Sequence, residues 1–128
     1  MRIVRSLILT TIVLVPSLGS TAELTKDSLA TVKKNVDQKK AVLVDVREKS
    51  EWNKGHVKGA IFLPLSALQE DAKTLSRRLP KDKIVYTHCV VGKRCVTAGN
   101  FLEKLGYEVR PIKPGYKELV AAGFQSEK

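Results

Sequence analysis

Residues 83–95 are KIVYTHCVVGKRC, an apolar run that passes into a basic loop containing a glycine. The first six residues, Lys83–His88, are rich in β-branched and aromatic side chains, which predicts a buried strand. Residues 94–105 predict a helix, because Gly106 follows them as a C-terminal cap. A strand that leads through a short loop into a helix is one unit of a parallel α/β sheet.

Alternating strands and helices extend on both sides of this unit, with no internal repeat or linker. We therefore expect an α/β fold of three layers, a central parallel sheet of about five strands with helices on both faces. Strands are predicted over 41–46, 61–63 and 107–112, and helices over 26–36 (capped by Thr25), within 48–59, over 66–79 (capped by Ser66) and over 116–122.

The N-terminus has the order of parts of a signal peptide. Arg2 and Arg5 precede an apolar run over 7–15, which Pro16 breaks and small residues follow. We predict a signal peptide over 1–22, cleaved after Ala22, and one domain over 23–128. We expect export to the periplasm, without stable membrane insertion after cleavage. A retained anchor or a buried N-terminal strand is the alternative.

The chain is basic, with 23 Lys and Arg against 13 Asp and Glu, a formal net charge of +10. Cleavage would remove only Arg2 and Arg5, which leaves +8. The lysines are spread along the chain without interleaved aromatic residues, which indicates a solvated surface. We expect no nucleic acid among the partners.

Cys89 lies where the predicted strand turns toward a helix N-terminus. Free backbone N–H groups and the helix dipole favour an anion there, and Lys93 and Arg94 add positive charge, so we expect a thiolate. Gly92 would let the loop curl so that its amides point inward. A nucleophilic sulfur beside a pocket for a small oxyanion suits a thiosulfate-like donor, a Cys89 persulfide, and a cyanide or thiol acceptor. An inert buried cysteine is the alternative.

Two separated motifs resemble the rhodanese (thiosulfate sulfurtransferase) family, in particular its exported, single-domain, phage-shock-protein-E-like type. The first is Asp45-Val46-Arg47-Glu48, with Glu51-Trp52, Gly55-His56-Val57, Gly59-Ala60 and Pro64 after it, and the second is Cys89 with Gly92, Arg94 and Ala98. The resemblance covers nearly all of residues 23–128. It implies the rhodanese-like fold and sulfur transfer.

The resemblance also implies roles for single residues. Cys89 matches the sulfur-carrying nucleophile, and a substrate-binding loop follows it, closed by Arg94. Asp45 and Arg47 match residues that brace the fold near the site. The loop consists of Val90, Val91, Gly92, Lys93 and Arg94. Four residues separate Cys89 from Arg94, as in sulfurtransferases of this superfamily, whereas related phosphatases and arsenate reductases have five.

Cys95 follows Arg94, where relatives often have Ser or Thr. Two interpretations stay open: a resolving cysteine that forms a disulfide with Cys89, which would call for a thiol reductant protein, or a cysteine packed at the helix start. His88 should project away from Cys89, because neighbouring residues of a strand alternate. We expect no metal and no cofactor. A redox-sensing or non-catalytic binding module, and less so a phosphatase or arsenate reductase, remain alternative functions. Residues 113–119 depart from the family pattern, which leaves the donor and acceptor unnamed.

Overall fold

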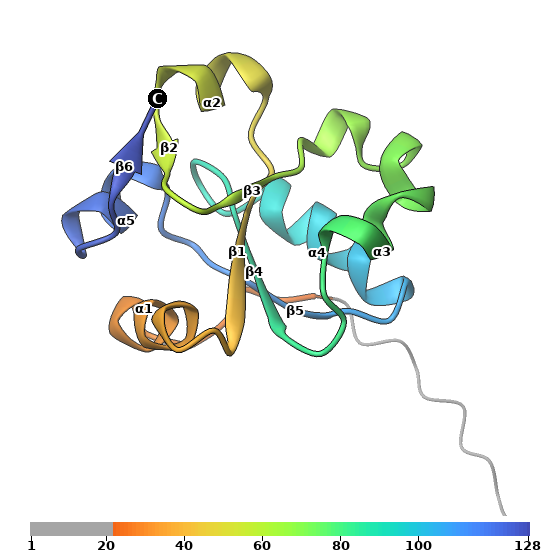
Figure 1. Cartoon of the computed structure of the whole chain (residues 1–128), viewed down its shortest axis with the longest axis horizontal. Coiled ribbons are helices and arrows are strands. Elements are labelled where there is room, and N and C mark those ends of the chain that lie inside the picture. Colours follow the sequence, from red (N-terminus) through yellow and green to blue (C-terminus); the bar gives the residue numbers. More distant parts are fainter. Residues whose placement is uncertain (1–21) are drawn as a thin grey trace, which may run out of the picture.

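The computed structural model describes residues 22–128 as an α/β fold in three layers (Figure 1). The predicted signal peptide therefore lies outside the described residues except for Ala22. The helices are α1 (Leu29–Asp37), α2 (Lys49–Lys54), α3 (Leu75–Arg78), α4 (Arg94–Lys104) and α5 (Tyr116–Ala121). The strands are β1 (Ala41–Asp45), β2 (His56–Val57), β3 (Ile61–Phe62), β4 (Ile84–His88), β5 (Glu108–Pro111) and β6 (Ser126–Glu127).

The central sheet is parallel, in the order β3-β1-β4-β5. It has four strands, so the expectation of about five was too high. The two other strands of the described chain, β2 and β6, form a separate antiparallel ribbon. Each has only two residues, too short for an alternation pattern to be recognised in the sequence.

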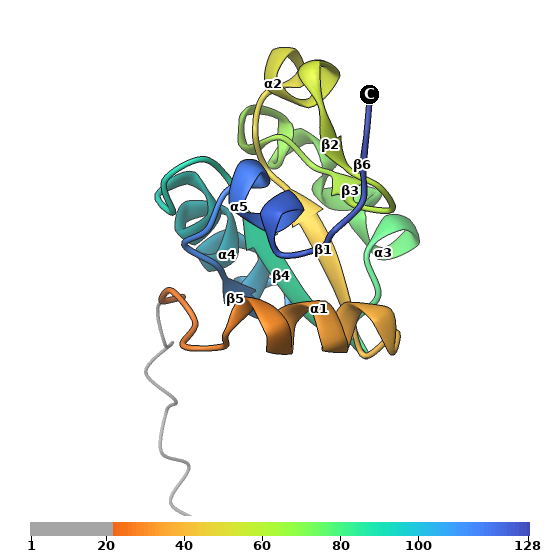
Figure 2. The same cartoon turned by 90° about the vertical axis from the view of Figure 1, so that its left-hand side faces the viewer.

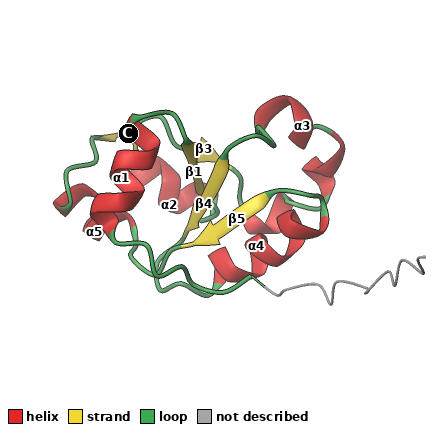
Figure 3. Ribbon diagram, turned by 90° about the horizontal axis from the view of Figure 1, so that it is seen from below, coloured by secondary structure: helices red, strands yellow, loops and turns green. Residues whose placement is uncertain are grey.

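Helices cover both faces of the sheet, as predicted. Figures 2 and 3 show α1 and α5 on one face and α3 and α4 on the other. Each face has its own buried cluster. The first cluster includes Val44, Leu75, Val85, Cys95 and Leu102, and the second includes Val32, Leu43, Tyr86, Ile112 and Leu119. Both cysteines belong to the first cluster, between the sheet and α4.

Helix α1 begins later than predicted. Ser28 rather than Thr25 caps it, and the Ser28 hydroxyl accepts a hydrogen bond from the Thr31 amide at 3.2 Å. Residues before Ser28 are held by β4 and β5 instead: the Thr25 amide donates to the Pro111 carbonyl at 2.7 Å, and Tyr86 donates to Asp27 at 2.7 Å. These tertiary contacts outweigh the local capping preference.

The helix predicted over 66–79 is broken into short pieces. Two 3-10 turns (Leu65–Ala67 and Glu70–Lys73) precede the single turn of α3. Leu68, Leu75 and Leu79 are buried in the first cluster. These leucines reach the core from short pieces of helix, so their burial does not require one continuous helix.

The described chain begins packed against α4 and beside β5. Ala22 is buried, and its amide donates to the Asn100 side chain at 2.5 Å. Within residues 22–128, the helices are all too short or too polar to cross a membrane.

Candidate active site

The loop over 89–93 lies at the edge of the sheet where the parallel strands end (Figure 1). β4 ends at His88, and α4 begins at Arg94. Gly92 has φ of +85°, the left-handed conformation that lets the loop curl as predicted. A side chain at this position would also press on Leu24 and on the Lys113 backbone, at 3.3 and 3.4 Å from its Cβ.

The Cys89 sulfur accepts hydrogen bonds from several neighbouring groups. The backbone amide of Cys95 lies 3.4 Å from the Cys89 Sγ atom. The pKa of Cys89 falls to about 4, chiefly because the Cys95 thiol hydrogen-bonds to it, with the amides of Cys95, Gly92 and Val91 adding to the effect against burial. The Cys89 side chain is therefore a thiolate at neutral pH, the reactive form of cysteine.

This arrangement changes one part of the sequence interpretation. Lys93 and Arg94 were expected to lower the pKa of Cys89 by their charge, but the hydrogen bonds from Cys95 and the loop amides come first. The reason lies in distance and solvent: donors in direct contact with a buried sulfur act more strongly than charges on exposed or already paired side chains.

Cys95 is a second buried thiol directly beside Cys89. It is fully buried, and its Sγ atom lies 3.4 Å from the carbonyl oxygen of Ile112. The adjacent Cys89 thiolate and burial raise the pKa of Cys95 far above its ordinary value, so Cys95 keeps its proton. The two cysteines are not joined by a disulfide in this structure.

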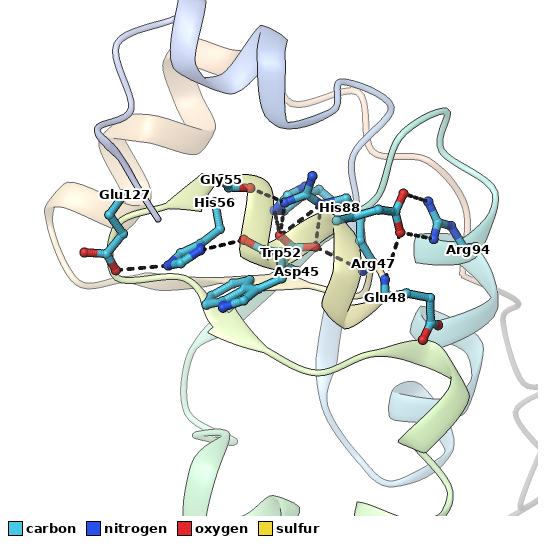
Figure 4. Close-up of polar contacts among 10 residues, drawn as sticks. Asp45, Arg47, Glu48, Trp52, Gly55, His56, His88, Arg94 and Glu127 are labelled. Atoms are coloured by element: carbon cyan, nitrogen blue, oxygen red, sulfur yellow. Dashed lines mark hydrogen bonds and ion pairs between the residues drawn. The ribbon is translucent and has the colours of Figure 1, made fainter.

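Arg94 fixes the start of α4 to α2 (Figure 4). Its guanidinium group donates to both carboxylate oxygens of Glu51, at 2.7 and 2.9 Å. The same carboxylate accepts the Glu48 amide at 2.9 Å, and these bonds lower the pKa of Glu51 to about 2, the Arg94 bond most of all. Arg94 therefore holds the loop at its C-terminal end. Glu51 was quoted in the first motif, but the sequence did not indicate that it would pair with Arg94.

Asp45 and Arg47 form a buried brace at the end of β1, close to the loop. The Arg47 guanidinium donates to both Asp45 oxygens and to the Gly55 carbonyl, the two Nη2 bonds being 2.8 Å long (Figure 4). Asp45 pairs in register with His88, the residue before Cys89. This geometry agrees with the bracing role that the family resemblance implies.

His88 is buried among these groups and does not bond to the thiolate. Its Nε2 atom lies 3.7 Å from an Asp45 oxygen, and neither ring nitrogen has a hydrogen-bond partner within the described residues. Burial lowers the pKa of His88, so the ring is neutral at neutral pH. A Cys89–His88 dyad is thus absent, as the alternation of strand residues predicted.

The rim of the loop is apolar and tightly packed against the segment before α5. Val90 and Val91 are 50% and 65% exposed, and Leu24, which lies next to Gly92, is 39% exposed. A Cβ atom on Gly115 would lie 2.9 Å from the Val90 carbonyl oxygen and 3.0 Å from that of Cys89. Glycine is therefore required at 115 by close approach, a requirement that no sequence pattern indicated.

A second polar group joins the C-terminal ribbon to α2. The His56 ring stacks on Trp52 with centroids 3.5 Å apart, and its nitrogens contact the Trp52 carbonyl and Glu127 (Figure 4). These contacts join α2 to β2 and β6. In residues 22–128, no three His, Cys, Asp or Glu side chains lie close enough together to hold a metal ion.

A cysteine thiolate held by a strand-to-helix loop of a parallel α/β sheet is typical of proteins that use a cysteine as a nucleophile. Residues 28–122 match the family Rhodanese, described as the rhodanese-like domain. The chain belongs to the rhodanese family.

Relatives agree with this assignment. The chain is 38% identical over 81 residues to the uncharacterised protein YqhL of Bacillus subtilis. This match covers 62% of this chain and 61% of YqhL. It is 31% identical over 85 residues to the "Putative thiosulfate sulfurtransferase, mitochondrial" of Schizosaccharomyces pombe, with 59% and 60% covered. The matched stretches thus span less than two thirds of these relatives.

Solved structures share the fold. A rhodanese-related protein of Thermoplasma volcanium superposes with a TM-score of 0.65 at 28% identity, covering 77% of this chain and 93% of that protein. Fold and family model therefore agree, and one relative is named as a putative thiosulfate sulfurtransferase.

Proposed function

We propose that this chain is an exported sulfurtransferase that carries sulfane sulfur on Cys89. One observation carries the proposal: the Cys89 sulfur sits among the Cys95 thiol and the amides of Cys95, Gly92 and Val91, and its pKa is about 4. A thiolate of this kind is both a nucleophile and a group that tolerates anionic sulfur.

The first half-reaction takes sulfur from a small anionic donor such as thiosulfate. The Cys89 thiolate attacks the outer sulfur of thiosulfate, the S–S bond of the donor breaks, and sulfite leaves with the electron pair. Cys89 then carries a persulfide whose terminal sulfur is negative. The loop amides, with Gly92 in its left-handed conformation, point toward the region where this charge develops.

The second half-reaction passes the sulfur to a thiophilic acceptor. Cyanide attacks the outer sulfur to give thiocyanate, or a thiol attacks it to give a new persulfide, and the Cys89 thiolate returns. The exposed Val90 and Val91 leave the rim of the loop open to an acceptor. We propose that the partners are a small anionic donor and an acceptor, either a thiol or cyanide. We expect no nucleic acid among them.

Four residues between Cys89 and Arg94 support sulfur transfer over phosphate chemistry, because the smaller ring fits a sulfur atom better than a tetrahedral phosphate. Export is proposed from the signal-peptide pattern of residues 1–22. Cell fractionation and N-terminal sequencing of the purified protein test it: a periplasmic chain beginning at Glu23 is expected. Recovery of a chain that begins at Met1 in the cytoplasm would contradict export.

The central test is transfer of sulfur from thiosulfate to cyanide by the wild-type chain beside Cys89→Ser and Cys89→Ala. We expect thiocyanate formation and the added mass of one sulfur atom in the wild type, and neither in the two variants. No turnover and no added sulfur in reduced wild-type protein would favour a redox-sensing or binding module. Hydrolysis of a phosphate ester, without any sulfur transfer, would favour a phosphatase.

A further inference from the structure

The two cysteines of this chain are neighbours through their sulfur atoms, not only through the sequence. The Cys95 amide donates a hydrogen bond to the Cys89 Sγ atom at 3.4 Å, and the two side chains are close enough that each shifts the pKa of the other. Cys95 is 0% exposed and Cys89 1% exposed. No dissolved thiol can occupy this position, so Cys95 is the thiol best placed to reach the inner sulfur of a Cys89 persulfide.

We propose that Cys95 is a second catalytic residue that resolves the Cys89 persulfide, releasing hydrosulfide and leaving a Cys89–Cys95 disulfide. The inference rests on the proposed function, because it begins from the persulfide formed with thiosulfate. It adds an activity, sulfide release without an external acceptor. It also adds a resting state, an oxidised chain that must be reduced before it can accept sulfur again.

The step is balanced without an added oxidant. The Cys95 sulfur attacks the Cys89 sulfur and forms the S–S bond between the two residues, while the bond between Cys89 and the outer sulfur breaks. The outer sulfur leaves with that electron pair and takes the Cys95 proton, so it departs as HS⁻. The two cysteine sulfurs are oxidised to a disulfide, and the sulfane sulfur is reduced to sulfide.

The structure also provides a reason why this step would wait for the persulfide. In the free site the Cys89 thiolate keeps Cys95 protonated, so Cys95 acts as a donor and not as a nucleophile. Persulfide formation moves the negative charge to the outer sulfur, one atom farther from Cys95. The Ile112 carbonyl, 3.4 Å from the Cys95 Sγ atom, holds the thiol in place while the charge moves.

Formation of the bond requires only local movement. The two sulfurs must move from a non-bonded position to an S–S distance of about 2.05 Å. Cys95 is in the first turn of α4, and Cys89 is in the loop before it, so loop residues 90–93 can adjust without separating the sheet from α4. Regeneration of the two thiols then needs a dithiol reductant, which is the partner class that this inference implies.

The test uses the full chain, reduced and freed of reductant, treated with thiosulfate in the absence of oxygen and of any acceptor. Sulfite, sulfide and the intact mass of the protein are measured together, and non-reducing peptide mapping locates any disulfide. In the wild type we expect one sulfite and one sulfide per chain and a Cys89–Cys95 linkage. In Cys95→Ser, which keeps a hydroxyl donor, we expect one sulfite, no sulfide and a persulfide that persists.

The outcomes separate the two proposals. A wild-type persulfide that persists without sulfide or a disulfide would overturn the role of Cys95 and leave the proposed function intact. Sulfide release that is equal in wild type and Cys95→Ser would overturn it as well, as would a disulfide that forms without sulfide. If neither protein yields sulfite or gains sulfur, the proposed function itself fails. Should Cys95→Ser fold poorly, Cys95→Ala gives the same comparison.

Discussion

At the scale of single residues, the site depends on how closely two backbones approach each other. Gly115 touches the carbonyl oxygens of Val90 and Cys89, and a methyl group there would lie 2.9 and 3.0 Å from them, respectively. Backbone atoms cannot rotate away as a flexible side chain can. The conformation of the cysteine loop is therefore set partly by a residue more than twenty positions away in the sequence.

We expect Gly115→Ala to displace the loop and lower thiosulfate turnover by about tenfold or more, with a loss of stability of about 1–3 kcal/mol. Steady-state kinetics and urea unfolding measure the two effects. Gly59→Ala is the control, because Gly59 has a φ of +81° but nothing within 4 Å of its Cβ position. It should cost about 1 kcal/mol of stability with normal turnover. Equal turnover in both variants would contradict this account.

The second prediction at this scale concerns the pH dependence of Cys89. Its pKa of about 4 means that the thiolate forms as pH rises through that value, and the rate of alkylation by iodoacetamide should follow the thiolate fraction. The rate should therefore be nearly constant from mildly acidic to neutral pH and fall toward pH 4, whereas an ordinary thiol would still gain reactivity near pH 9.

Cys95 variants test the physical cause of this shift. The Cys95 thiol makes the largest contribution, so Cys95→Ala should move the midpoint of the alkylation profile upward, and Cys95→Ser should move it less. The profile is read by mass spectrometry of the alkylated peptide. An unchanged midpoint in Cys95→Ala would assign the low pKa to the backbone amides alone.

At the scale of elements, one ion pair links the two family motifs. Glu51 lies in α2 and Arg94 begins α4, and their groups meet in two hydrogen bonds of 2.7 and 2.9 Å. The pair is about one third exposed. It belongs to the class of surface pairs that contribute about 1 kcal/mol or less, so its main effect is to position α4 and the loop.

Glu51→Gln should remove a stability contribution that depends on pH. The pKa of Glu51 is lowered in the folded state from 4.5 to about 2, so its contribution is fully present above pH 4.5 and is lost as pH falls through about 2. Urea unfolding over this range should show a steeper acid loss for the wild type than for Glu51→Gln. Parallel curves would mean that the Arg94–Glu51 pair does not stabilise the fold.

Elements also show where prediction from the sequence succeeded and where it failed. The strands around Val44 and Val85 were correct, because β-branched runs buried on both faces give a strong pattern. The loop at Gly92 followed from its position between strand and helix. The predicted start of α1 was wrong, because contacts of Thr25 and Asp27 with distant strands hold the residues before Ser28. The predicted helix over 66–79 was also wrong, because its buried leucines pack against the core from short turns. The hydrogen bond from the Cys95 amide to the Cys89 sulfur was not predicted, because the spacing of residues does not determine how close the loop brings them.

At the scale of the whole molecule, charge and topology act together on the site. The chain has a formal net charge of +10, and exposed Lys93 and Lys113 lie at the loop. Lys113 belongs to the segment whose backbone lies 3.4 Å from a Cβ on Gly92. A positive field of this kind attracts a doubly charged anion and leaves a neutral molecule unaffected.

The rate at which Cys89 reacts with thiosulfate should therefore fall with salt by roughly threefold or more between low salt and about 0.5 M, because added ions screen charges beyond the Debye length. Iodoacetamide is neutral, so its rate with the same thiolate should hardly change, and it serves as the matched reagent. Lys93→Gln and Lys113→Gln should each flatten the salt dependence for thiosulfate. Lys40→Gln, which is exposed at the opposite end of β1, should not. Equal salt dependence for both reagents would assign the effect to the loop conformation and not to attraction of the donor.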